Sequence, residues 1–170
     1  MRVETYLRLF RDGAEIRLPF GSALPLSQTL EPIGTASQLR RDVNGVLRSS
    51  HDAAFRKYSS SISGDAHVPA SLGDLWPGDL LTVHCAATLR QPMLGATSVI
   101  LGRDAVPDSV IVYDALTRPV SHTISGRTVS ADGGEHVCYK PVLTMRVASL
   151  SQSQVDRRGQ CEWSLNMEEV

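Results

Sequence analysis

The residues best spaced for metal chemistry are His136 and Cys138, in the segment HVC. Alternate side chains of a strand share a face, so both groups could ligate one ion. Cys161, or His84 with Cys85, could complete a zinc site in space. However, three widely spaced cysteines without a C-x-x-C pair are atypical of zinc ribbons and of disulfide frameworks. All three lie in apolar alternating runs, where cysteine acts as a small core residue, so we expect no metal and no cofactor.

Signatures of catalysis are missing from the sequence. It contains no G-x-S-x-G, H-E-x-x-H, phosphate loop, dinucleotide fingerprint or EF-hand loop. The five histidines are widely spaced along the chain. Asp104, Asp108 and Asp114 lack the spacing and the glycine of a calcium loop and are typical of turns. The sequence therefore predicts a protein that is not an enzyme.

A basic cluster surrounds the dipeptide at 44–45, and its members are Arg40, Arg41, Arg48, Arg56 and Lys57. Such a cluster could bind nucleic acid or an acidic protein surface. Few aromatic residues accompany it, and the formal net charge of the whole chain is -1. The composition therefore favours a protein contact or a solvated face, and we expect no nucleic acid partner.

The elements that must position these residues read as strands. Asn44 and Gly45 tolerate positive φ and are flanked by valines, which predicts a tight hairpin with a type I′ turn. The segment RVETYLRLF alternates apolar and charged residues and predicts an N-terminal strand. The segment LLTVHCAATL is apolar on both faces, which indicates a strand buried between two layers.

The end of the chain predicts a long hairpin that completes a sheet. A three-residue loop at 157–159, with Gly159 left-handed, would make Arg157 and Arg158 the other loop residues. This loop length places five apolar side chains on one face: Met145, Val147, Trp163, Leu165 and Met167. A loop of two or four residues would divide them between two faces, so burial favours three residues.

Two stretches are poor in regular patterns. Residues 18–34 hold three prolines and two glycines and predict a Pro-rich arm or loop. Residues 90–136 are rich in turn formers and predict a loop-rich insertion, with a protruding hairpin ending at 132–134. We expect a single β-rich domain over 1–170. Its fold class is mostly β, an antiparallel β-sandwich or barrel with a long Pro-rich arm and extended loops.

The first residues carry charges where a signal peptide would need an apolar core, and no run approaches a membrane span of about 18 apolar residues. We therefore expect synthesis in the cytoplasm and no membrane span.

Several blocks of the chain together resemble a known group of proteins. These blocks are LSQTLEPIG, LRRDVNG, FRKYSSSISG, VPASLGDLWPGD and WSLNMEEV. They are similar to small structural proteins encoded among the tail genes of long-tailed, siphovirus-like bacteriophages, and they cover most of 26–76 and 140–170. The resemblance implies a virion protein of the baseplate or tail tip, made in the host bacterial cytoplasm. It implies a homo-oligomeric ring around the tail axis, other tail or baseplate proteins as partners, and no active site.

For this role we expect the arm to be mobile in the free chain and ordered against a neighbouring subunit. The expected assembly contacts are Leu26, Leu30, Ile33, Arg40, Arg41 and Trp76. One alternative is a carbohydrate- or receptor-binding module of the tail, with Trp76 as its aromatic platform. A cell-wall hydrolase is a further alternative, for which the sequence offers no catalytic pair.

Overall fold

The computed structural model describes residues 5–23, 25–33, 37–51, 56–155 and 159–170. Within these ranges the chain consists of antiparallel strands and loops and has no helix, which confirms the expected mostly β fold class. The main sheet is open, with β2 and β3 at its edges, and its strand order is β2-β1-β7-β16-β17-β6-β3. Its strands are β1 (Arg8–Arg11), β2 (Ala14–Ile16), β3 (Leu26–Pro32), β6 (Tyr58–Ala66), β7 (Leu80–His84), β16 (Pro141–Val155) and β17 (Gln160–Glu169).

One apolar cluster lies on the inner face of the main sheet. Leu9, Ile62, Val83 and Leu165 are fully buried there and come from four different strands. The loop between β6 and β7 contributes Leu72 to the same cluster, so this loop covers part of the sheet. Alternation along β3, β6 and β17 leaves polar side chains on the other face, as expected for a half-buried antiparallel sheet.

Residues 89–140 form a second lobe with its own apolar cluster, centred on the fully buried Val112, Val129 and Val137. Its strands are β8 (Leu89–Pro92), β9 (Ser98–Ile100), β10 (Asp104–Ala105), β11 (Ile111–Tyr113), β12 (Pro119–Val120), β13 (Thr123–Ser125), β14 (Thr128–Ser130) and β15 (His136–Tyr139). They form the sheets β12-β11-β15-β8 and β13-β14-β9, while β10 pairs with β16. The expected loop-rich insertion at 90–136 therefore contains several short paired strands, and turns and loops join them.

The protruding hairpin expected in this lobe turns at a different place. β13 and β14 pair with Ser125 opposite Thr128, so the turn lies at Gly126, which has positive φ. Residues 132–134 instead connect β14 to β15. Three-residue strands carry too little sequence pattern to identify, and their pairing across the lobe defines them.

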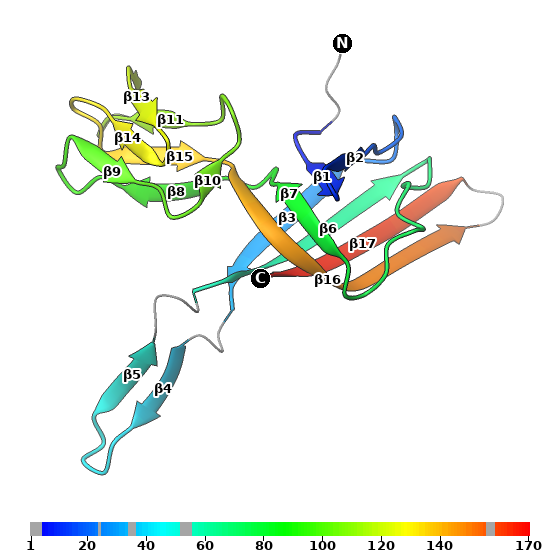
Figure 1. Cartoon of the computed structure of the whole chain (residues 1–170), viewed down its shortest axis with the longest axis horizontal. Coiled ribbons are helices and arrows are strands. Elements are labelled where there is room, and N and C mark those ends of the chain that lie inside the picture. Colours follow the sequence, from blue (N-terminus) through cyan, green and yellow to red (C-terminus); the bar gives the residue numbers. More distant parts are fainter. Residues whose placement is uncertain (1–4, 24, 34–36, 52–55, 156–158) are drawn as a thin grey trace.

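The long strand β16 runs from the second lobe into the main sheet (Figure 1). Its register with β17 corrects the expected loop. Val155 pairs with Gln160, so residues 156–159 separate the strands and the three-residue loop is wrong. Gly159 has φ +62°, as expected, whereas Arg157 and Arg158 lie outside the described residues.

A β-bulge explains how the apolar residues of this hairpin still share a face. The register shifts between Val147 and Ser149, which adds one residue to β16 and reverses the faces beyond it. Met145 and Val147 are therefore buried with Trp163, although the loop length alone would separate them. Burial predicted the correct face, and a bulge rather than the loop length satisfies it.

The expected Pro-rich arm at 18–34 is another correction. Its second half is strand β3, which pairs with β6 from Leu26 opposite Gly64 to Pro32 opposite Tyr58. Leu26 and Leu30 pack against the main apolar cluster. The prolines at positions 25 and 32 obscured the strand, but proline is tolerated where a strand begins and ends and on a sheet edge.

The hairpin expected around Asn44 is confirmed, and it projects away from both lobes (Figure 1). It consists of β4 (Ser37–Arg41) and β5 (Leu47–His51), which form a two-stranded sheet of their own.

Candidate functional site

The turn of the β4–β5 hairpin, which we call the projecting hairpin, is organised by Asp42. One oxygen of its carboxylate accepts hydrogen bonds from the N–H groups of Asn44 and Val46, at 2.9 and 3.0 Å. The other oxygen accepts a hydrogen bond from Arg48 Nε at 2.9 Å. This hydrogen bond makes the largest contribution to the lowered pKa of Asp42. Only Gly45 of the turn has positive φ, so the turn is not the expected type I′.

The tip of the projecting hairpin is apolar and open to solvent. Val43 is fully exposed, and Val46 and Leu47 are 56% and 52% exposed. A lone two-stranded hairpin is marginally stable in water. Exposed aliphatic groups on a hairpin that stands apart from the core are typical of a contact with another surface.

The chain segment that follows the projecting hairpin is anchored by Glu169. The side chain of Glu169 is 8% exposed, and its oxygens lie 2.5 and 3.0 Å from Nε and Nη2 of Arg103. The same carboxylate accepts the Tyr58 N–H at 2.9 Å, while Arg103 also donates to the carbonyl of Arg56. The hydrogen bond to Glu169 raises the pKa of Arg103. One carboxylate thus joins β17, the second lobe and the start of β6.

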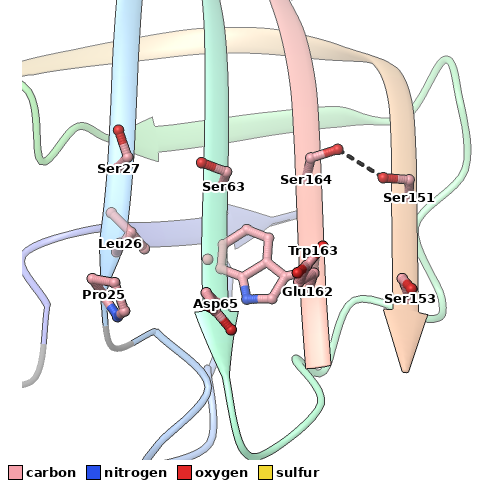
Figure 2. A pocket seen from close by; sticks show the side chains of 11 residues that line it. Pro25, Leu26, Ser27, Ser63, Asp65, Ser151, Ser153, Glu162, Trp163 and Ser164 are labelled. Atoms are coloured by element: carbon pink, nitrogen blue, oxygen red, sulfur yellow. Dashed lines mark hydrogen bonds between the residues drawn. The ribbon is translucent and has the colours of Figure 1, made fainter. Parts of the chain in front are cut away.

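A second feature is the outward face of β3, β6, β17 and the last part of β16, which we call the hydroxyl face. One row across these four strands is Ser27, Ser63, Ser164 and Ser151, as Figure 2 shows. The hydroxyls of Ser164 and Ser151 lie 2.7 Å apart. The next row is Thr29, Ser61, Asn166 and Ser149, in which Asn166 donates to Ser149 at 2.9 Å.

Carboxylates lie at both ends of the hydroxyl face. Asp65 and Glu162 are direct cross-strand neighbours at one end. At the other end Ser59 lies between Glu31 and Glu168 on the flanking strands. Like charges placed directly opposite destabilise a sheet, so the pair of Asp65 and Glu162 lowers the stability of the free protein.

A hollow of about 400 Å³ opens on this face between the serine row and the acidic pair. Its lining includes Leu26, Gly64 and Trp163, which occupy one cross-strand row. The side chains of Leu26 and Trp163 belong to the inner cluster, and Gly64 has none, so backbone forms the floor of the hollow. Small polar side chains around it leave the surface accessible to a partner.

The expected assembly contacts fall into two groups. Leu26 and Leu30 pack in the main core, and the partly buried Ile33 donates its N–H to the carbonyl of Lys57. These three residues are therefore part of the folded sheet, and this packing does not fit an exchangeable arm. Arg40 lies in β4, Arg41 ends β4 and donates to the Gly45 carbonyl, and Trp76 is 71% exposed in the β6–β7 loop.

The residues considered for metal chemistry are not brought together. His136 and Cys138 lie in β15 of the second lobe, whereas Cys161 is buried in β17 of the main sheet. In the described ranges, no group of three His, Cys, Asp or Glu side chains could hold a metal ion. Burial raises the pKa of Cys85 to about 12, so this thiol is inert at neutral pH.

His84 is an unusual histidine. Its Nδ1 is buried and has no hydrogen-bond partner among the described residues, and the centre of its ring lies 4.8 Å from that of Phe10. Burial lowers the pKa of His84, and the positive charge of Arg8 lowers it further. The folded structure therefore favours the neutral imidazole over its charged form.

The hydroxyl face was missed from the sequence. Its signal is the alternation of serine in YSSSISG, SLSQSQ and WSLN, but the pairing of these segments was needed to show one surface.

No protein-family model, curated protein or solved structure matches the chain. No helix in the described part of the chain has the length and apolar character needed to cross a membrane.

Proposed function

We propose that this chain is a non-enzymatic structural subunit of a bacteriophage tail, located in the baseplate or tail tip, which assembles through its projecting hairpin. The observation that carries the proposal is the exposed apolar tip formed by Val43, Val46 and Leu47. The resemblance of the sequence blocks to phage tail proteins supplies the biological setting.

The energetics support assembly through this hairpin. Burying an aliphatic side chain contributes about 1.5–3 kcal/mol, so three tip residues could supply a substantial part of a specific contact. The anchoring of Tyr58 and Arg56 by Glu169 and Arg103 fixes the start of β6, which limits the entropy lost when the hairpin binds.

The direct test replaces the tip with polar residues: Val43→Ser, Val46→Ser and Leu47→Thr. We expect the melting temperature of the isolated protein to change little, because the tip lies outside both apolar clusters. Incorporation into tail particles should fall to background. The matched control carries Leu94→Ser, Ile100→Ser and Leu116→Ser, at exposed positions of the second lobe, and should assemble normally. Normal particles from the tip variant would reject the proposal.

A carbohydrate-binding module is the second candidate, because Trp76 exposes 71% of its surface in a loop. Exposed aromatic rings stack on sugar faces. Binding of the intact protein to host cell-wall polysaccharide, abolished by Trp76→Ala, would favour this function. Assembly without any glycan binding would favour the first.

A further inference from the structure

We infer that the projecting hairpin of one copy docks on the hydroxyl face of a second copy of this chain. The inference rests on the proposed function and specifies its partner. Three properties of the two surfaces favour a second copy as the docking partner: their charge, their shape and their position.

The two surfaces carry opposite charge. The projecting hairpin presents the exposed Arg41 and Arg48 against the single carboxylate of Asp42, and its sequence adds a third positive charge at Arg40. The hydroxyl face presents the four carboxylates of Glu31, Asp65, Glu162 and Glu168. Arg146 lies opposite Glu168 on the neighbouring strand β16 and offsets part of this negative charge. Opposed potentials of this kind accelerate association and select the partner.

The shapes also match. The serine and threonine side chains of the hydroxyl face are short, so a two-stranded ribbon can pack close to the backbone of this sheet. The hollow of about 400 Å³ beside Gly64 has room for an aliphatic side chain of the hairpin tip. Serine hydroxyls around it can bond to the polar backbone of an arriving turn.

The position of the hairpin excludes an intramolecular contact in this conformation. The hairpin leaves the sheet near Pro32 and Tyr58, whereas Asp65 and the hollow lie at the opposite end of β6 (Figures 1 and 2). Figure 1 shows the hairpin directed away from the main sheet. A second copy must therefore supply the face.

The contact would be heterologous, because the hairpin of each copy meets a different surface of the next. Heterologous contacts generate closed rings when the rotation between neighbours closes, and open filaments when it does not. A ring is the arrangement that a protein repeated around a tail axis needs.

The test joins two separately made proteins with a short thiol crosslinker. One carries Asn44→Cys at the hairpin turn, and the other carries Ser63→Cys on the hydroxyl face. The unmodified protein measures the background from its natural cysteines. A partner with Ser125→Cys, exposed in the second lobe, is the matched negative control. We expect crosslinked dimers only between the hairpin and face variants.

Charge reversal on the hydroxyl face is the second test. The double variant Asp65→Lys, Glu162→Lys should weaken self-association measured by sedimentation about tenfold and abolish the crosslink. Asp132→Lys, exposed in the second lobe, is the control and should leave both unchanged. High salt should weaken the wild-type contact, because exposed charges contribute to it.

The outcomes separate the two proposals. Self-association without the hairpin–face crosslink would overturn this inference and leave the assembly function intact. A protein that stays monomeric at its highest soluble concentration and gives no crosslink would also overturn it. Incorporation of the tip variant into tail particles, by contrast, tests the proposed function whichever surface receives the hairpin, and normal particles would overturn both proposals.

Discussion

Replacing Gly64 by alanine should strongly destabilise the main sheet, although the backbone of Gly64 is ordinary strand. A Cβ atom at this position would lie 2.5 Å from Nε1 and 2.6 Å from Cε2 of Trp163. Van der Waals contact begins near 3.4 Å, so the indole would have to retreat by about 0.9 Å. Trp163 is 3% exposed, and its Nε1–H donates to the carbonyl of the buried Ser22 at 2.7 Å.

The magnitude follows from these contacts. Overpacking a well-packed core costs about 1–3 kcal/mol. Breaking the bond from Trp163 to Ser22 leaves a buried polar group unsatisfied, which costs about 1–3 kcal/mol more. The lower entropy of the unfolded chain with alanine offsets about 0.4–1 kcal/mol. We expect a net loss of about 2–4 kcal/mol in the free energy of unfolding, and a melting temperature lower by about 6–12 °C.

Urea unfolding followed by tryptophan fluorescence is the assay. A Trp76→Phe background removes the exposed indole, so the emission reports Trp163 alone. Gly73→Ala is the matched control, because a Cβ there meets nothing within 4 Å and its φ is not positive. The reasoning is refuted if Gly64→Ala changes the unfolding free energy no more than Gly73→Ala and leaves the emission unchanged.

Four further predictions follow from individual contacts. Glu169→Ala should cost about 2–3 kcal/mol, because Arg103 and the Tyr58 N–H lose their acceptor, and proteolysis at the base of the projecting hairpin should accelerate; unchanged cleavage would contradict the anchoring role. The lowered pKa of His84 means that the unfolded state binds the extra proton more readily. The contribution of His84 to the free energy of unfolding is therefore fully present above the unfolded pKa of about 6.5 and is lost as the pH falls below it. Denaturant titrations at several pH values should show that His84→Gln makes the free energy of unfolding depend less on pH in this range. Cys85, with its pKa near 12, should stay unmodified by a thiol reagent in the native protein and react after unfolding; rapid native labelling would show that its site opens. Deleting residues 161–170 removes most of β17, which lies between β16 and β6, so soluble protein should be lost, whereas an unchanged melting temperature would refute the central role of this strand.

The sequence by itself predicted the elements that carry strong local patterns. The hairpin around Asn44 was predictable because a turn signal between two valines acts over a few residues. The buried face of β17 was predictable because Trp163, Leu165 and Met167 alternate with polar residues. The mostly β class followed from many such short segments.

Tertiary structure decided the features that depend on partners distant in sequence. Pro25 before β3 and Pro32 at its end favoured an arm, and only pairing with β6 makes 26–32 a strand. The bulge after Val147 is a compromise between the register at the turn and burial of the inner face, which no local pattern encodes.

The candidate surfaces divide in the same way. The arginines of the projecting hairpin are close together in sequence, so the sequence alone marked them as a basic cluster suited to a protein contact or a solvated face. The exposure of the tip residues Val43, Val46 and Leu47 came from the structure. The hydroxyl face is assembled from serines that lie more than a hundred residues apart, such as Ser27 and Ser164. A single serine in a strand carries no functional signal, because its meaning arises only when register aligns it with serines on the neighbouring strands.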